Sequence, residues 1–262
     1  MMPAHPQAFP LHERHPAATP RRPCAPKALL PWNRLLACLP EAVWQRWQPH
    51  LVAVELALGK VLCEPGGRLT HVVFPTTAII AQNYLTEEGH SAGTSIIGNE
   101  GMVGNWLVLG GASTPAQVVV LCVGSAWRMR AGTLTDEFEH SPAVMHLLLR
   151  FTQALMMQTG QTAVCNRHHT LEQQLCGWLL RNLDRLTSNE VVMTHELIAS
   201  MLGVRREGVT EAAGHLHKAG LIDYHRGHIE VLDRHGLERR ACECYGVVRH
   251  EYERLLPEAV AC

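Results

Sequence analysis

The spacing of apolar residues changes at Ser141, and this change divides the chain into a β-rich part and a helical part. Before Ser141, segments with alternating apolar residues, such as 52–58 and 78–85, are separated by turns that contain glycine. Alternation is typical of half-buried strands, and many short strands joined by glycine turns predict a sandwich or a barrel-like roll. After Ser141 the apolar spacing is helical. The sequence therefore predicts an α+β protein with an N-terminal β-roll at residues 28–140.

The segment before the roll has a different composition. Eight of the 15 prolines lie within residues 1–31, where no apolar periodicity develops, and we predict a disordered tail at residues 1–27. The chain has no run of 18 apolar residues, and its N-terminus lacks the apolar region of a signal peptide, which favours a cytoplasmic protein without a membrane partner. Its nine cysteines are an odd number in a chain of 262 residues, so we expect free thiols.

A long helix is predicted directly after the roll, at residues 141–166. Ser141 is a good N-cap, and Pro142 suits the first helical position. Mostly apolar residues then recur in alternating steps of four and three, which is the spacing of a coiled-coil seam. The predicted seam residues are Val144, Leu148, Phe151, Leu155, Gln158 and Thr162. We interpret the segment as a dimerisation helix that packs on the roll and on a second copy of itself, and the alternative is one buried helix in a monomer.

The stretch from Thr194 to Ile222 reads THELIASMLGVRREGVTEAAGHLHKAGLI. Two segments with helical spacing flank Gly203, which permits a sharp turn, and Thr194 can cap the first of them. Two alternating segments follow, around a turn at residues 225–227, and predict a small hairpin. A helix pair followed by a hairpin is a winged helix, which we predict within residues 167–262.

A final helix is predicted after the hairpin. Its apolar stripe runs from Leu237 to Leu255, so that Cys244 lies near the packing face and Cys242 is more exposed. We interpret both cysteines as core or incidental thiols rather than metal ligands.

In a winged helix the start of the second helix enters the major groove of DNA, and this gives the charged residues after Gly203 a role. Arg206 can donate two hydrogen bonds to guanine, and Glu207 can accept one from cytosine. The residues better suited to phosphates are Arg205, Thr210, Tyr224 and Arg226. Charged residues on a helix most often only face solvent. Here the helix cap, the turn and the hairpin agree, so we predict DNA binding.

Acidic residues outnumber basic ones in this region, so DNA binding must depend on where the basic residues lie and not on net charge. The formal net charge is -1, and the segment from Val191 to Asp233 contains four Lys or Arg and six Asp or Glu. Five histidines of this segment would gain positive charge below about pH 6.5. They are His195, His215, His217, His225 and His228. We therefore expect the affinity for DNA to rise between about pH 7.5 and pH 6.

Two motifs resemble the Crp/Fnr family of bacterial transcription regulators. The pattern T-x-E-x-I-A-x-M-L-G-V-x-R-E-x-V-T followed by G-L-I resembles its helix-turn-helix, and IGNEGMVG with a later LGG resembles a corner of its effector-domain roll. The resemblance implies a cyclic-nucleotide-binding-like roll, a dimer helix and a winged helix that binds a two-fold symmetric DNA site, with RNA polymerase as a partner. By position, Arg206 and Glu207 match base-reading residues of the family, and Glu211 stands where a later base-reading arginine is found.

The effector pocket departs from the family pattern. Members that bind cyclic AMP hold its phosphate with a Gly-Glu corner and an Arg-Ser or Arg-Thr pair, and the matching residues here are Gly104, Asn105, Pro115 and Ala116. Without a guanidinium group for the phosphate we expect no cyclic AMP, although an unknown small effector can use the same cavity. The iron-sulfur branch needs a cysteine cluster near the N-terminus, where this chain has only Cys24 and Cys38, so we predict no such cluster.

Other kinds of site have little support in the sequence. His168 and His169 lie close to Cys165, but no recognised ligand spacing is present, and we predict no metal site. No nucleophile, base and orienting group can be placed together, so we predict no catalytic residues. Two alternatives remain open: a ligand-sensing module that acts through protein contacts, and an enzyme whose site lies in the roll.

Overall fold

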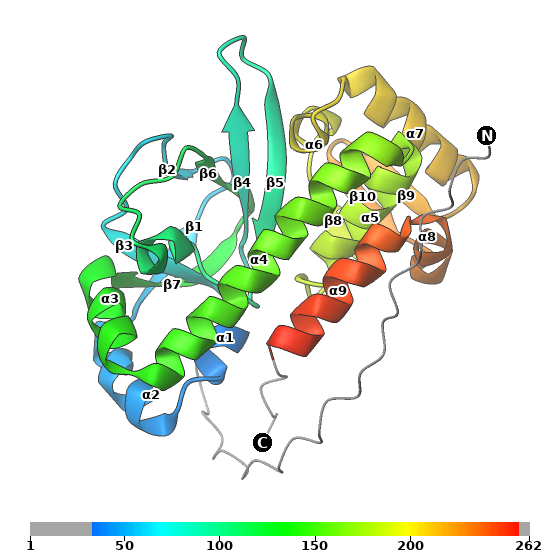
Figure 1. The fold of residues 1–262 in the computed structure, drawn as a ribbon. Coiled ribbons are helices and arrows are strands. Elements are labelled where there is room, and N and C mark those ends of the chain that lie inside the picture. Colours follow the sequence, from blue (N-terminus) through cyan, green and yellow to red (C-terminus); the bar gives the residue numbers. More distant parts are fainter. Residues whose placement is uncertain (1–32, 257–262) are drawn as a thin grey trace, which may run out of the picture.

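The computed structural model describes residues 33–256, which form a β-rich domain, a long helix and a C-terminal domain of helices with a small sheet (Figure 1). This arrangement confirms the predicted fold class. The predicted tail at residues 1–27 lies outside the described residues. No helix within residues 33–256 has both the length and the hydrophobicity needed to cross a membrane.

Two antiparallel sheets form the roll. In the first sheet, β7 (Gly124–Arg130) pairs with β1 (Val52–Leu56) on one side and with β3 (His71–Pro75) on the other. The second sheet has four strands, in the order β2 (Val61–Cys63), β6 (Gln117–Cys122), β4 (Ile79–Leu85) and β5 (Ser91–Ile97). The two 3-10 helices of the described roll are η1 (Gln48–His50) and η2 (Asn105–Leu109).

Short helices close the ends of the roll. α1 (Arg34–Ala37) and α2 (Glu41–Trp47) are separated by a short connection that ends at Pro40. Asn33 caps α1 and also donates hydrogen bonds from Nδ2 to the carbonyl oxygens of Pro75 and Gly101, at 2.8 and 2.9 Å. A further helix, α3 (Ala131–His140), connects the roll to the long helix α4 (Pro142–His168).

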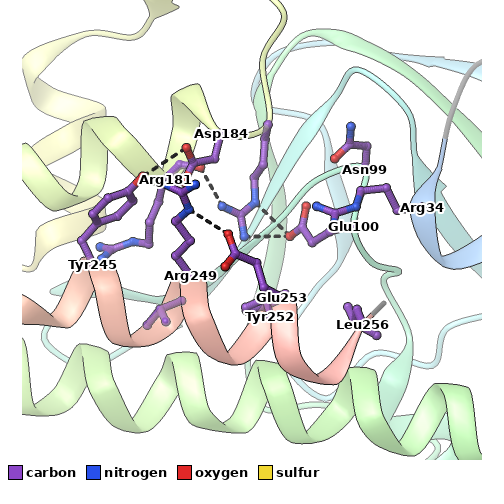
Figure 2. A pocket seen from close by; sticks show the side chains of 12 residues that line it. Arg34, Asn99, Glu100, Arg181, Asp184, Tyr245, Arg249, Tyr252, Glu253 and Leu256 are labelled. Atoms are coloured by element: carbon purple, nitrogen blue, oxygen red, sulfur yellow. Dashed lines mark hydrogen bonds and ion pairs between the residues drawn. The ribbon is translucent and has the colours of Figure 1, made fainter. Parts of the chain in front are cut away.

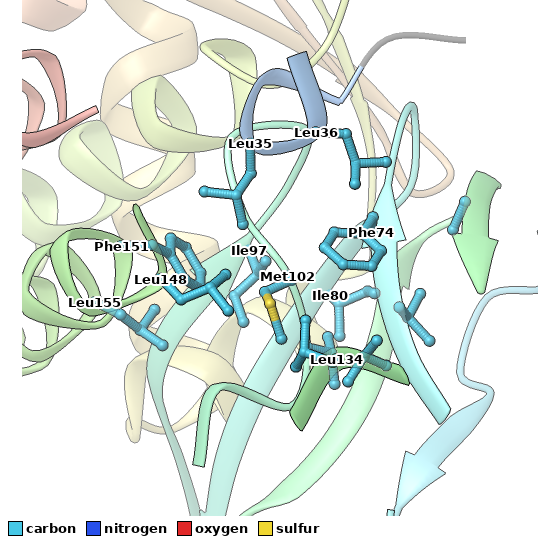
Figure 3. Close-up of a cluster of buried hydrophobic side chains, with 14 of the residues drawn as sticks. Leu35, Leu36, Phe74, Ile80, Ile97, Met102, Leu134, Leu148, Phe151 and Leu155 are labelled. Carbon is cyan, nitrogen blue, oxygen red and sulfur yellow. The ribbon is translucent and has the colours of Figure 1, made fainter. Parts of the chain in front are cut away.

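One hydrophobic core joins the roll to α4 (Figure 3). Phe151 of α4 is fully buried and lies with Ile97 and Met102 of the roll. A Cβ atom on Gly101 would lie 2.2 Å from the Phe151 ring, so only glycine permits this close approach. Burying a phenylalanine side chain stabilises a protein by about 1.5 to 3 kcal/mol, and α4 is therefore part of the roll's core.

The predicted dimer seam lies in this core, and this corrects the sequence-based interpretation. Among the seam residues, Val144, Leu148, Phe151, Leu155 and Gln158 are buried within a single chain, and Thr162 is half-buried. Gln158 donates a hydrogen bond from Nε2 to the carbonyl oxygen of Ile96 at 3.2 Å. The spacing correctly indicated a packed helix face. Its partner is the chain's own roll, because periodicity reports that a face is covered and not what covers it.

The C-terminal domain places two helices beside a small sheet. α5 (Leu171–Leu183) leads to α6 (His195–Leu202) and α7 (Arg206–Lys218). The sheet has the order β8 (Glu190–Val192), β10 (His228–Val231) and β9 (Ile222–His225), and it includes one strand more than the predicted hairpin. Helices α8 (Arg234–Arg240) and α9 (Glu243–Leu255) follow.

The predicted final helix is interrupted at Ala241 and Cys242, and its second half runs back along α4 (Figure 1). Cys242 is the N-cap of α9 and is only 6% exposed. Cys244 is only 1% exposed, so Cys242 is, as expected, the more exposed of the two cysteines, although both are buried. The break between α8 and α9 turns Cys242 into the interior, beside Cys244.

Candidate nucleic-acid interface

The turn between α6 and α7 is built by local signals in the sequence. Thr194 Oγ1 accepts a hydrogen bond from the Leu197 N–H at 3.2 Å and caps α6. Gly203 follows α6 in the left-handed conformation, with φ of 68°, so that the chain can turn sharply into α7. The packed face of α7 consists of Val209, Ala212, Ala213 and Leu216. The opposite face of α7 is therefore turned to solvent.

This exposed face begins with the predicted base-reading residues. Arg205, Arg206 and Glu207 are exposed, and neither arginine has an ion pair within residues 33–256. Arg206, Glu207, Thr210 and Glu211 line one open depression of the surface. The N-terminus of a helix adds partial positive charge at the same place. The structure thus brings the three predicted base-reading residues together at the start of α7.

Thr210 is held by hydrogen bonds inside the protein. Its hydroxyl group donates to the carbonyl oxygen of Arg206 at 3.0 Å and lies 3.1 Å from His195 Nδ1. Because a hydroxyl has one hydrogen, His195 Nδ1 is the donor in the second contact. Thr210 therefore has no hydrogen left for a phosphate in this arrangement. Its observed role is to position the first turn of α7, which differs from the predicted phosphate contact.

His195 connects α6 to the wing. Its ring lies 4.8 Å from that of Tyr224, and its buried Nε2 has no hydrogen-bond partner among the described residues. Burial and, to a smaller extent, the charge of Arg206 lower the pKa of His195. His195 therefore stays neutral at pH values where a free histidine gains a proton. It does not supply the positive charge expected from it, and half-buried Tyr224 acts here as its packing partner.

The other four histidines of this region each lie beside a carboxylate. The pairs are His215 with Glu172, His217 with Asp223, His225 with Asp223, and His228 with Glu190.

The tip of the wing is a two-residue turn formed by Arg226 and Gly227. Both residues have positive φ, 47° and 89°, and His225 pairs with His228 across the turn. This is the geometry of a type I′ turn, in which Asn-Gly is a favoured pair. A left-handed conformation costs a residue with a Cβ atom about 1 to 2 kcal/mol. An exposed arginine at this position points to a use for its side chain.

The predicted effector residues lie in a tightly packed corner of the roll. Gly104 has a φ of 109°, and a Cβ atom there would lie 2.9 Å from both Leu69 and Val72. Ala116 is buried, and its N–H donates to Thr114 Oγ1 at 3.2 Å. Beside Gly104, the buried Oδ1 of Asn105 has no hydrogen-bond partner among the described residues. The chain's own side chains therefore fill the space around Gly104, while one polar atom stays without a partner.

A cavity of about 220 Å³ lies where the roll, α5 and α9 meet (Figure 2). Its wall includes an ion pair in which Arg185 Nε and Nη2 lie 2.8 and 2.7 Å from Glu100 Oε1, and both side chains are less than a tenth exposed. Burial acts to lower the pKa of Arg185, but Glu100 and smaller contributions raise it above its ordinary value. The pair joins the roll to the C-terminal domain. Sequence reasoning missed it, because 85 residues separate its members.

Residues 173–240 match the family model of the Crp-like helix-turn-helix domain. This match runs from α5 to the end of α8 and includes the whole exposed face described above. No curated protein sequence matches the chain.

Several solved structures share the fold. A Eubacterium rectale ATCC 33656 protein assigned to the Crp/Fnr family has 18% identity, covers 77% of this chain and 94% of its own, and gives a TM-score of 0.62. FixK2 from Bradyrhizobium japonicum has 14% identity, 73% and 98% coverage, and a TM-score of 0.62. A transcriptional regulator of the Crp family from Thermus thermophilus has 16% identity, 72% and 96% coverage, and a TM-score of 0.61.

The chain joins a β-roll to a winged helix through a long helix. The second helix of the winged helix begins with arginines that have no ion pair among the described residues. These features define a DNA-binding transcription regulator. The matched domain is a Crp-like helix-turn-helix, and solved regulators of the Crp/Fnr family share the fold of the described residues. The Crp/Fnr resemblance stated from the sequence motifs is confirmed, and the findings support a DNA-binding transcription regulator.

Proposed function

We propose that this regulator binds a two-fold symmetric DNA site as a homodimer in the cytoplasm, and that α4 forms the dimer contact through a face other than the predicted seam. The observation that carries the proposal is the exposed position of Arg206 at the start of α7, without an ion pair among the described residues. One such helix reads a half-site of a few base pairs, and a dimer would read two half-sites one helical turn apart.

A second stripe on α4 supports the dimer contact. It alternates steps of three and four along the solvent face of the helix, which is the spacing needed for a partner helix. Leu149 and Met156 on this stripe are 40% and 67% exposed, which is unusual for large apolar side chains in a helix of 27 residues. The exposed stripe consists of His146, Leu149, Gln153, Met156, Gly160, Ala163 and Arg167.

The geometry of α7 and the wing supports the following residues of the proposed DNA contact. In this proposal Arg206 donates to guanine, and Glu207 and Glu211 accept from exocyclic amino groups. Arg205 and Arg226 are exposed on either side of them and suit phosphates. RNA polymerase is part of the proposal as the partner that the family resemblance implies.

Selection of DNA sites from a random pool tests the DNA contact. We expect the full-length protein to enrich an inverted repeat whose half-sites are about 10 base pairs apart, centre to centre. Enrichment of single, unrepeated sites would contradict the homodimer, and no enrichment would contradict base reading by α7.

Substitution of the exposed stripe tests the dimer. Met156→Lys places a charge in the proposed contact, and we expect a monomer by light scattering together with a loss of binding to the inverted repeat. Val123→Lys is the matched control, because Val123 is also 67% exposed but lies in the roll. A dimer that survives Met156→Lys unchanged would place the contact elsewhere.

Gating by an unknown small effector is the remaining part of the proposal. The unpaired buried Oδ1 of Asn105 supports a polar ligand in this corner, and such a ligand would have to displace the side chains that fill the space around Gly104. Repeating the site selection with candidate molecules tests this, and we expect no effect of cyclic AMP. Tight calorimetric binding of cyclic AMP would overturn the expectation that follows from Pro115 and Ala116.

A further inference from the structure

Three cysteines and one histidine meet where α4, α5 and α9 come together. Cys165 lies in the last turn of α4 and His169 follows that helix, while Cys242 and Cys244 lie at the start of α9. One potential ligand atom from each residue lies within 4.8 Å of all the others. The three cysteines are 5%, 6% and 1% exposed and form a small buried cluster of their own. From these residues we propose a tetrahedral site for a single zinc ion.

The distances between the four atoms fit a single ion. Cys165 Sγ lies 3.5 Å from Cys242 Sγ, and Cys244 Sγ lies 3.4 Å from His169 Nδ1. Zinc–thiolate bonds of about 2.3 Å in a tetrahedron place two sulfur atoms about 3.7 Å apart. A disulfide bond would need the sulfur atoms about 2.05 Å apart. The cluster is therefore close to the geometry of a Cys3His zinc site before any movement of the backbone.

The surroundings of the four residues are those of a metal centre. The other ring nitrogen of His169, Nε2, lies 3.3 Å from Glu243 Oε1, and a ligating histidine commonly donates its second N–H to a carboxylate. Gln161 Nε2 donates to Cys244 Sγ at 3.1 Å, which is a hydrogen bond that stabilises a thiolate. These contacts orient the ligand side chains from outside the cluster.

A positively charged side chain near the cluster also fits a zinc site. Zinc with three thiolates and a neutral histidine carries a net charge of -1. The Arg181 guanidinium, which has no hydrogen bond or ion pair among the described residues, is close enough to Cys165, Cys242 and Cys244 to interact with them electrostatically. This half-buried cation beside three thiols lacks a negative partner among the described residues, and the zinc-bound thiolates would supply it.

The arrangement indicates a structural role for the ion. All four positions come from protein side chains, which is typical of structural zinc sites. The ligands belong to two segments separated by more than 70 residues, so one ion would hold α9 against the end of α4. This site is independent of the DNA contact proposed above. It revises the expectation that the cysteines are incidental and that the chain has no metal site.

Metal analysis of the full-length protein tests the proposal. We expect about one zinc ion per chain by mass spectrometry after gel filtration, and sulfur-to-metal charge-transfer bands with tetrahedral ligand-field bands when Co²⁺ replaces zinc. We expect His169→Ala and Cys244→Ala to lose the metal. His169→Cys should retain it, because four donors remain. Folded wild-type protein with reduced thiols that binds neither zinc nor Co²⁺ would overturn the proposal.

Neighbouring residues provide matched controls. His168 is exposed and adjacent to His169, and Cys176 is a fully buried cysteine outside the cluster, so His168→Ala and Cys176→Ala should keep the metal. Glu243→Ala should weaken zinc binding about tenfold by removing the partner of His169. Circular dichroism shows whether each variant folds. If Cys244→Ala fails to fold, the His168→Ala, His169→Ala and His169→Cys set decides, and equal metal content in all three would overturn the proposal.

Discussion

Arginine side chains are used in opposite ways at the start of α7 and at the junction of the two domains. Arg206 is exposed and has no ion pair among the described residues, whereas Arg185 is buried and paired with Glu100. An unpaired guanidinium in water keeps its hydrogen bonds available to DNA, and a buried one must be matched to avoid a large cost. Arginine therefore serves DNA binding at the start of α7 and holds the two domains together at their junction.

The largest expected effect is at the junction. Glu100→Gln keeps the size of the side chain but leaves Arg185 buried without a negative partner, and we expect the free energy of unfolding to fall by about 3 to 5 kcal/mol. Glu137→Gln is the control, because its partner Arg46 is 54% exposed and water replaces the lost contact of the guanidinium group, so we expect a clearly smaller loss. Urea denaturation measures both. Similar losses would remove the distinction between the two kinds of arginine.

The next effect concerns base reading. Arg206→Ala should cost about 1 to 3 kcal/mol of binding at one base position and leave stability within about 0.5 kcal/mol. Lys218→Ala, at the other end of α7, is the control and should leave base preference unchanged. Affinities for the selected site and its single-base variants measure the effect. A loss of equal size on every sequence would show that Arg206 contacts phosphate instead.

A smaller effect, with opposite signs for stability and binding, is expected at the wing. Arg226→Asn should stabilise the protein by about 0.5 kcal/mol, because asparagine accepts the left-handed conformation more readily. The same change should weaken binding to all sequences about equally and reduce the salt dependence by about one counterion. Arg226→Lys keeps the charge and should keep the salt dependence. Unchanged binding by Arg226→Asn would mean that the wing does not reach DNA.

The smallest effect is on pH dependence. Because the pKa of His195 is lowered in the folded protein, the unfolded chain takes up this proton first as the pH falls below about 6.5, and folded-state stability is lost in that direction. His195→Gln should make the loss of stability between about pH 6.5 and pH 5 less steep. It should leave the pH dependence of DNA binding unchanged. Denaturation at several pH values and binding titrations check the two statements.

Much of the DNA-binding domain could be predicted from sequence because its signals are local. The cap at Thr194, the left-handed Gly203 and the turn at Arg226 and Gly227 each depend on a few neighbouring residues. The positions of Arg206 and Glu207 on the exposed face follow from helical periodicity once the packed face is identified. The third strand β8 was missed because three residues carry too little periodicity.

The sequence by itself determined most of the helices and strands, the apolar face of each of them, and the resemblance to the Crp/Fnr family. Only the tertiary structure decided that the predicted seam of α4 packs on the chain's own roll, that Arg185 meets Glu100, and that Cys165 and His169 meet Cys242 and Cys244. Periodicity is a property of consecutive residues, whereas the partner of a buried face depends on how distant segments pack. Only the packing of distant segments in the folded chain therefore determines which segment covers a buried face.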